Sequence, residues 1–148
     1  MGCCIHFHIE VKIDDRWEHY ATPNVWRNYA LFSLLVNVRN VEPDHRDYVE
    51  PLSQPKGLPN DISAITRIAY KDYEGDAHSA SWLSGDEIIK VAKEIPKLHG
   101  RNLTHQRDLE EVLGTHLFEN SFSEFCNKER DDFPPELQDV RFVFWFDN

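Results

Sequence analysis

Residues 3–13 read CCIHFHIEVKI, and this run decides how the chain folds. Apolar side chains recur at every second position from Cys3 to Ile13, which is the period of a β-strand with one buried face. The positions between them carry polar and ionisable side chains, namely Cys4, His6, His8, Glu10 and Lys12. The run therefore predicts a strand that covers a core with one face and presents a row of ionisable groups on the other.

A second strand is predicted near the other end of the sequence, over residues 140–146. Its residues also alternate, but Val143 and Trp145 add apolar side chains on the face opposite the phenylalanines. A strand that is apolar on both faces belongs in the interior of a sheet. We therefore expect the two strands to lie in one sheet, with Phe7 and Ile9 of the first strand against the core.

The stretch between these strands carries signals for a hairpin, helices and a long loop. The dipeptide Asp14-Asp15 predicts a hairpin turn. Ser84 and Glu87 fit a capping box, which predicts the start of a helix that Pro96 ends. The remaining predicted elements are a return strand over 16–20, a helix over 25–38 capped by Asn24, an ordered proline-rich loop over 40–61, a strand over 65–70, and helical segments over 104–113 and 117–125.

Together these elements predict an α+β fold. We expect a single compact domain over residues 1–148, with a mainly antiparallel sheet that includes both terminal strands and is covered by helices. A length of 148 residues suits one domain, and 41% hydrophobic and 12% aromatic residues suit a packed core.

Charge and hydropathy exclude several classes of protein. The formal net charge of −10 disfavours nonspecific binding to nucleic acid, because such binding requires a surface that neutralises phosphates. No apolar run approaches the roughly 20 residues that a membrane-spanning helix needs. The first residues lack the basic segment of a secretory signal, and three cysteines do not form a disulfide framework. We therefore expect a cytoplasmic protein with reduced thiols and no membrane association.

The polar face of the first strand suggests a metal site. Cys4, His6 and His8 lie on one side at intervals of roughly 6.6 Å between Cα atoms. Thiolate and imidazole groups suit a divalent metal such as zinc, and a further ligand would come from a distant segment. The candidates for that ligand are His78, Asp76 and Asp147. The alternative is that both histidines are half-exposed strand residues, since a single H-x-H motif also arises by chance.

The stretch Asp76-x-His78-Ser79-x-Ser81 suggests an anion site with acid–base chemistry. It lies between a predicted strand and a predicted helix, where open helix N–H groups attract anions. The hydroxyls of Ser79 and Ser81 would bind phosphate oxygens, and His78 with Asp76 would be catalytic, transferring a proton near neutral pH. The alternative is that the two serines close a turn.

Arg27 and Asn28 offer a second set of ligand-binding groups at the start of the predicted 25–38 helix. A guanidinium and an amide suit recognition of phosphate, carboxylate or a base. The alternative for Arg27 is an ordinary solvated helix residue.

The C-terminal region is acidic, with eleven acids and four bases between Gln106 and Asn148. Such a surface can imitate nucleic acid and occupy a basic groove on a host protein. The commoner explanation is a solubilising face.

Five segments resemble a family of small uncharacterised proteins encoded mainly by bacteriophages and prophages, which begin with Met-Gly-Cys-Asp-Ile-His. The segments read MGCCIH (1–6), RNYALF (27–32), GLP (57–59), HSASWL (78–83) and FWFDN (144–148). The resemblance implies a phage origin, which would place the protein in the cytoplasm of the host cell. It also implies a shared pocket built from positions 4, 6, 27, 28, 61, 76, 78, 79, 81 and 147. The chain has Cys4 where the family has Asp, which shifts metal preference toward softer ions, and Ala80 where a second His is frequent.

The leading prediction is a phage accessory protein that acts in the conflict between phage and host. Its pocket would handle a small phosphorylated or nucleotide-like ligand, with metal-assisted hydrolysis, and would bring His6, Arg27 and His78 together. The alternative is an acidic, non-enzymatic inhibitor that binds a basic host defence assembly, either anti-CRISPR-like or a nucleic-acid mimic. A third possibility is an interaction module with a vestigial pocket. These alternatives differ in whether the protein is an enzyme.

Overall fold

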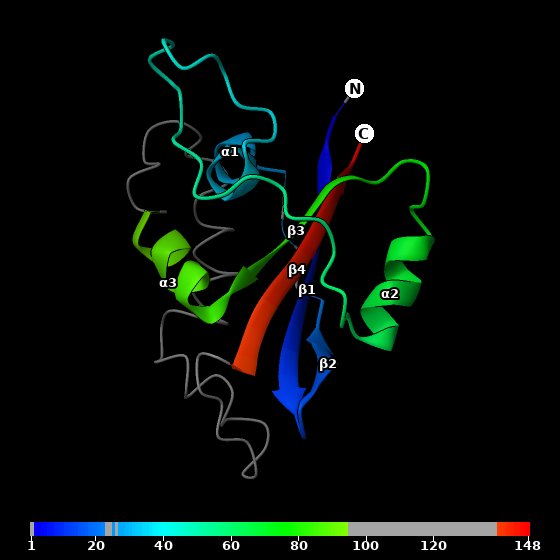
Figure 1. Cartoon of the computed structure of the whole chain (residues 1–148). Helices are drawn as coiled ribbons and strands as arrows, with labels where there is room; N and C mark the ends of the chain where they lie inside the picture. Colours follow the sequence, from blue (N-terminus) through cyan, green and yellow to red (C-terminus); the bar gives the residue numbers. More distant parts are fainter. Residues whose placement is uncertain (1, 23–24, 26, 95–138) are drawn as a thin grey trace.

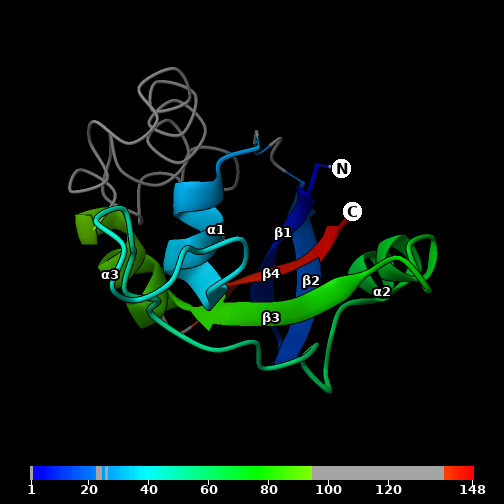
Figure 2. The ribbon, with the colours of Figure 1, turned by 90° about the horizontal axis from the view of Figure 1, so that it is seen from above.

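A four-stranded antiparallel sheet forms the centre of the fold, with helices on both of its faces (Figures 1 and 2). The computed structural model describes residues 2–22, 25, 27–94 and 139–148. The strands are β1 (Cys4–Ile13), β2 (Arg16–Ala21), β3 (His78–Ser84) and β4 (Val140–Asp147), in the order β2-β1-β4-β3. The helices are α1 (Tyr29–Val36), α2 (Ala64–Lys71) and α3 (Gly85–Glu94). The predicted α+β fold with both terminal strands in one sheet is confirmed.

The pairing of β1 with β4 generates the core. The two strands run antiparallel from Cys4 opposite Asp147 to Val11 opposite Val140. Their apolar faces meet α1 and α3, and Phe7 packs edge-on against Phe142 with ring centroids 4.6 Å apart. The predicted placement of Phe7 and Ile9 is confirmed, since both are at most 3% exposed.

The β1–β2 hairpin forms as predicted. Asp14 and Asp15 both take left-handed backbone conformations, with φ of 49° and 61°. Positive φ at both central residues is the signature of the tight turns whose twist matches paired strands.

Helix α1 is shorter than the predicted helix over 25–38, because a different residue caps it. The side-chain oxygen of Asn28 accepts a hydrogen bond from the Leu31 N–H at 3.1 Å, so the helix starts at Tyr29. It ends at Val36, since Asn37 adopts a left-handed conformation with φ of 60°.

The predicted strand over 65–70 is wrong, because this segment is helix α2. Its β-branched residues favour a strand by propensity, but Ser63 caps a helix by accepting a hydrogen bond from the Thr66 N–H at 3.3 Å. The helix buries Thr66 and leaves Ile65 and Ile68 more than half exposed. An isolated strand here would have no neighbour with which to share its hydrogen bonds.

The segment that starts at His78, predicted as a loop, is instead the edge strand β3. Its backbone pairs with β4, and the long loop over 40–61 lies against its outer side, where the Gly57 N–H donates to the Ala80 carbonyl at 2.8 Å. The capping box at the start of α3 is confirmed, since the Ser84 N–H donates to Glu87 Oε1 at 3.1 Å and the Glu87 N–H donates back to Ser84 Oγ. The predicted Asn24 cap, the stop at Pro96 and the helical segments over 104–113 and 117–125 lie outside the described residues.

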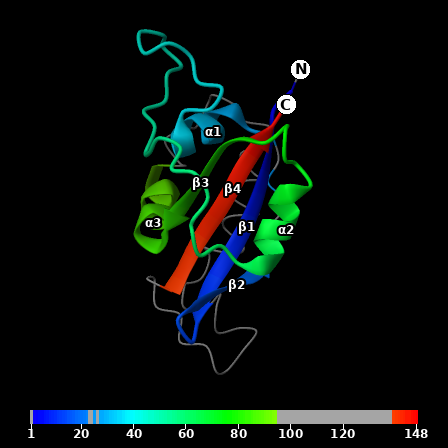
Figure 3. The ribbon, with the colours of Figure 1, turned by 45° about the vertical axis from the view of Figure 1, so that its right-hand side comes forward.

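The two faces of the sheet differ in character. Helix α2 lies over one face of the sheet, and α1 and α3 lie over the other (Figure 3). The face with α1 and α3 holds the apolar core, and the face beneath α2 carries ionisable and aromatic side chains. We call this second face the polar face. Among the helices that the structure describes, none has the length and apolar character needed to cross a membrane.

Candidate functional site

A histidine–carboxylate pair lies on the polar face at the end of the sheet where β1 begins and β4 ends. His6 Nε2 and Asp147 Oδ2 are 3.0 Å apart, and their side chains are 22% and 25% exposed. The His6 ring lies against Tyr73, with centroids 3.9 Å apart, and stacks on Trp145. Because the carboxylate accepts the Nε2–H proton, Nδ1 is left as the basic nitrogen. This arrangement can accept and return a proton.

A pocket of about 370 Å³ opens beside this pair, between β1 and α2. Its polar lining combines imidazole, hydroxyl and carboxylate groups from three separate segments. The lining residues that matter for a ligand are His6, His8, Thr22, Val25, Asp72 and Tyr73. The pocket therefore offers hydrogen-bond acceptors and donors next to a proton-transferring pair.

Arg27 lies near this site, because its guanidinium contacts Cys4 on the same strand as His6. The Arg27 guanidinium donates to Cys4 Sγ at 3.1 Å, and this hydrogen bond raises the pKa of Arg27. Cys4 is two residues from His6 on the same face of β1, which places the cation next to the pair. Gly2 leaves room for the guanidinium, because a Cβ atom there would overlap it.

His8 lies on the same face of β1 as His6, where both rings stack on Trp145, and its polar contacts are to β2 and the residue that follows it. Its Nδ1 lies 3.2 Å from His19 Nε2 and 3.2 Å from the Thr22 hydroxyl. Burial, and then the neighbouring His19, lower the pKa of His8 to about 4, and burial also lowers the pKa of His19. Both imidazoles are therefore uncharged at neutral pH.

The three predicted metal ligands share a face, as expected, but each takes a different partner. Cys4 contacts Arg27, His6 contacts Asp147, and His8 contacts His19. Within the described part of the chain, no group of three or more His, Cys, Asp or Glu side chains could hold a metal ion. The polar contacts that the structure shows at this end of the polar face are those of the His6–Asp147 pair and of Arg27 with Cys4.

His78 lies on the other face of the sheet, so the predicted convergence of His6, Arg27 and His78 is wrong. His6 is opposite Trp145 and His78 is opposite Phe146, and successive residues of β4 point to opposite faces. The His78 ring stacks on Phe146, its Nδ1 is 3.0 Å from Ser79 Oγ, and its Nε2 is 3.3 Å from Asn148 Oδ1.

Three other predicted site residues lie in a helix cap, a buried hydrogen bond and a turn. Asn28 is 4% exposed and caps α1, and Ser81 is fully buried, where its hydroxyl accepts a hydrogen bond from the Lys56 N–H at 3.2 Å. Asp76 is exposed in the turn between α2 and β3, where its backbone N–H donates to the Tyr73 carbonyl. These contacts account for Asn28 and Ser81 without a ligand.

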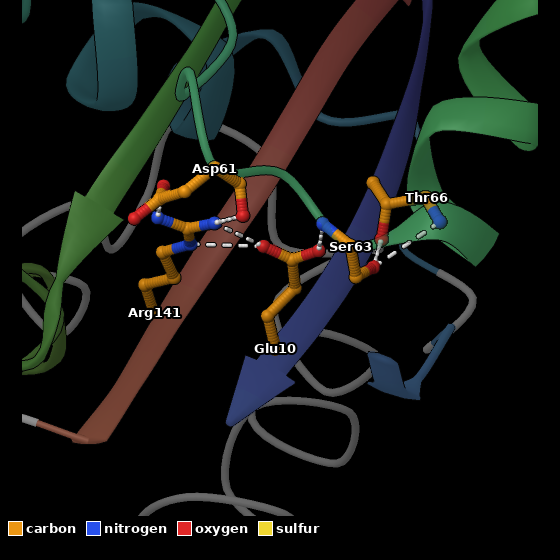
Figure 4. Close-up of polar contacts among 5 residues, drawn as sticks. All are labelled: Glu10, Asp61, Ser63, Thr66 and Arg141. Atoms are coloured by element: carbon orange, nitrogen blue, oxygen red, sulfur yellow. Dashed lines mark hydrogen bonds and ion pairs between the residues drawn. The ribbon is translucent and has the colours of Figure 1, made fainter. Parts of the chain in front are cut away.

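Sequence reasoning missed a buried ionic network that holds the loop before α2 against the polar face (Figure 4). Arg141 donates to Glu10 at 2.8 Å and to Asp61 at 2.7 Å, and the second Glu10 oxygen accepts the Ser63 N–H at 2.9 Å. The hydrogen bond from Arg141 lowers the pKa of Asp61. The available signal was an acid in one mainly apolar strand and a base in the other, Glu10 and Arg141, which the antiparallel register places opposite each other.

A larger pocket of about 610 Å³ lies at the opposite end of the polar face, between Trp17 and Trp82. Each indole ring is already covered by a cation, Arg141 over Trp17 at 4.1 Å and Lys56 over Trp82 at 4.2 Å. Both cations are paired with carboxylates, so this pocket offers no uncompensated positive charge to a ligand. We therefore regard the pocket beside His6 as the stronger candidate.

Comparison of the chain with protein-family models, curated proteins and solved structures gives no match. The resemblance to phage-encoded proteins stays a prediction. The functional assignment rests on the side chains described above.

Proposed function

We propose that the protein binds a small phosphorylated ligand in the pocket between β1 and α2. The observation that carries this proposal is the His6–Asp147 pair at 3.0 Å, half-buried at the pocket and next to the Arg27 guanidinium. A planar, permanently charged guanidinium is the side chain best suited to hold a phosphate.

The ligand would have a charged end and a polar body, and the two would bind at different places. Its phosphate would contact Arg27, outside the pocket, where it avoids the carboxylates of Asp72 and Asp147. Its body would enter the pocket, where Asp72 and the Thr22 hydroxyl accept hydrogen bonds from hydroxyl or amino groups. This division suits a nucleotide-like ligand, whose sugar and base carry such donors.

The His6–Asp147 pair would supply acid–base chemistry to the bound ligand. Nδ1 of His6 would take a proton from an attacking water as the water oxygen bonds to phosphorus, and Asp147 would stabilise the imidazolium that results. The bond from phosphorus to the ligand oxygen would break, and His6 would return the proton to that leaving oxygen. The resemblance to phage-encoded proteins supports a setting in the conflict between phage and host.

The binding test is a calorimetric titration with AMP, with adenosine as the phosphate-free probe. Loss of one charge-assisted contact in Arg27→Gln should weaken AMP binding by about tenfold and leave adenosine binding unchanged. The matched control is Arg46→Gln, since the Arg46 side chain is 90% exposed on a loop and pairs only with Asp47 among the described residues. Equal affinity of wild type for AMP and adenosine would contradict the proposal.

The chemical test is release of phosphate from p-nitrophenyl phosphate. His6→Gln should lower the rate by about 100-fold or more, which is the usual effect of a general base, and should leave AMP affinity nearly unchanged. The control is His45→Gln, because His45 is half exposed and, within the described part of the chain, its hydrogen bonds and ion pair are to residues of its own loop. An unchanged rate would exclude His6 as the base while leaving the binding proposal intact.

The acidic-inhibitor alternative is favoured by one observation, the net charge of −10. Most of the acidic C-terminal stretch lies outside the described residues. Neutralising Glu129, Asp131 and Asp132 should leave AMP binding unchanged if the pocket is the functional site, because exposed charges are screened over about 8–10 Å at physiological salt. The same change should abolish salt-dependent binding to a basic partner if the protein is an acidic inhibitor.

A further inference from the structure

We propose that Ser79 is a nucleophile, activated by His78 and positioned through Asn148, that reacts with activated carboxylic esters. These groups lie at the start of β3, on the face opposite the His6 pocket. His78 Nδ1 is 3.0 Å from Ser79 Oγ, and His78 Nε2 is 3.3 Å from Asn148 Oδ1. A hydroxyl, a base within hydrogen-bond reach and a third group that orients the base together define an activated nucleophile.

The hydrogen bonds fix which nitrogen of His78 is basic. The Arg39 guanidinium donates to Asn148 Oδ1 at 3.2 Å, which assigns that atom as the amide oxygen. An amide oxygen only accepts, so His78 Nε2 must carry the hydrogen in the neutral ring. Nδ1 is then the acceptor, and the Ser79 hydroxyl donates to it. The proton that must leave Ser79 during attack is already directed at the base.

The backbone of Ser79 explains how two adjacent side chains can meet. In a regular strand, neighbouring side chains point to opposite faces, which would separate Ser79 from the His78 ring. Here the register shifts between His78, opposite Phe146, and Ser81, opposite Phe144, and Ser79 adopts φ of 54°. Such bulges re-aim side chains and occur frequently next to active sites. The strained residue is the one that carries the hydroxyl.

Cys3 is the competing nucleophile, and its environment argues against it. Its sulfur lies 3.9 Å from His78 Nε2, but the residue is fully buried, and burial raises the pKa of the thiol. A buried thiol held in its neutral form reacts poorly. Ser79 and His78 are partly exposed, so a small ester can reach the hydroxyl.

The reaction consumes only the ester and water. Ser79 Oγ forms a bond to the carbonyl carbon while its proton passes to His78 Nδ1. The bond from that carbon to the leaving alcohol breaks, and the alcohol takes the proton from His78. Water then attacks the acyl-serine with His78 as base, which releases the acid and restores the hydroxyl. Asn148 is a positioning residue, since it acts through the imidazole.

The experiment uses p-nitrophenyl acetate with the whole chain, followed by release of p-nitrophenol and by mass spectrometry of the acetylated protein. The wild type should carry one acetyl group, mapped to Ser79. Ser79→Ala and Ser79→Gly should both lose the acetyl group and at least about 90% of the rate, since they remove the nucleophile. Glycine accepts the left-handed conformation, so the second variant keeps the backbone.

Two controls separate this site from background reactivity. Ser53→Ala, which removes a hydroxyl that donates to the Gln54 carbonyl, should leave the rate unchanged. Asn148→Leu should lower the rate about tenfold and shift its pH profile, whereas Asn148→Asp should restore it, because a carboxylate also accepts the Nε2 proton. Acetylation of Cys3 or a lysine instead of Ser79, or an unchanged rate in Ser79→Gly, would overturn the proposal. Loss of AMP binding would not affect it, since the two sites lie on opposite faces.

Discussion

The backbone of Ser79 carries an energetic cost that a single substitution can measure. A left-handed conformation costs an L-residue about 1–2 kcal/mol, and glycine does not incur this cost. We therefore expect Ser79→Gly to raise the free energy of unfolding by about 1 kcal/mol, measured by urea denaturation. Gly57→Ala is the converse control, because Gly57 has φ of 81° in open space, and it should lose a similar amount. A less stable Ser79→Gly variant would mean that the hydrogen bond to His78 outweighs the backbone cost.

At the same scale, the chain sequence predicted part of the site. Alternation alone placed Cys4, His6 and His8 on one face, and pairing of the terminal strands brought Asp147 next to His6. The contact of Arg27 with Cys4 joins residues 23 positions apart, which no local pattern links. The separation of His78 from His6 depends on the register of β3 on β4. A bulge sets that register, and the periodicity of the sequence does not predict the bulge.

At the scale of elements, the buried network of Glu10 and Arg141 joins β1, β4 and the loop before α2. Arg141→Met would leave the Glu10 carboxylate without its cation at a position that is 0% exposed. We expect a loss of about 3–5 kcal/mol in the free energy of unfolding, because an unpaired buried charge is costly. Glu10→Met combined with Arg141→Met should recover most of this loss, since apolar replacements of buried pairs are often neutral.

The matched control for that cycle is Arg67→Met, an exposed arginine on α2, which should change stability by less than about 0.5 kcal/mol. Equal losses in the double variant and in Arg141→Met would contradict the role of Glu10 as a charge that depends on Arg141.

Other elements show where local patterns are sufficient and where packing decides. Strand β1, the Asp14-Asp15 turn and the Ser84–Glu87 cap carry their own signals, and all three were predictable. Helix α2 was not predictable in this way, because its β-branched residues favour a strand. Only its cap at Ser63 and the polar surface beneath it make the helical alternative better.

At the scale of the whole molecule, the buried histidines make stability depend on pH. The folded state lowers the pKa of His8 from 6.5 to about 4 and lowers that of His19 as well. Between these values the unfolded chain binds more protons than the folded protein, so stability falls as pH falls from about 6.5 to about 4. Because solvent reaches the pocket beside His8, we expect a loss of only about 1–2 kcal/mol from this residue.

Urea denaturation at about pH 7 and about pH 5 measures this loss. His8→Gln removes one titrating ring and should flatten the pH dependence, whereas His45→Gln, an exposed control, should leave it unchanged. Equal pH dependence in wild type and His8→Gln would show that His8 titrates alike in both states.

The place of β4 in the sheet also governs how the chain reaches its folded state. This strand joins β1 to β3, yet its residues lie more than a hundred positions along the chain from their partners in β1, as in the pair of Cys4 and Asp147. Closing so long a loop costs entropy before any pairing compensates it, and proteins dominated by such distant contacts fold slowly. Until β4 is added, β1 pairs only with β2 and β3 has no partner strand in the described sheet, so the apolar faces of both are exposed. Folding intermediates of this protein should therefore bind chaperones or aggregate unless the last strand is added quickly.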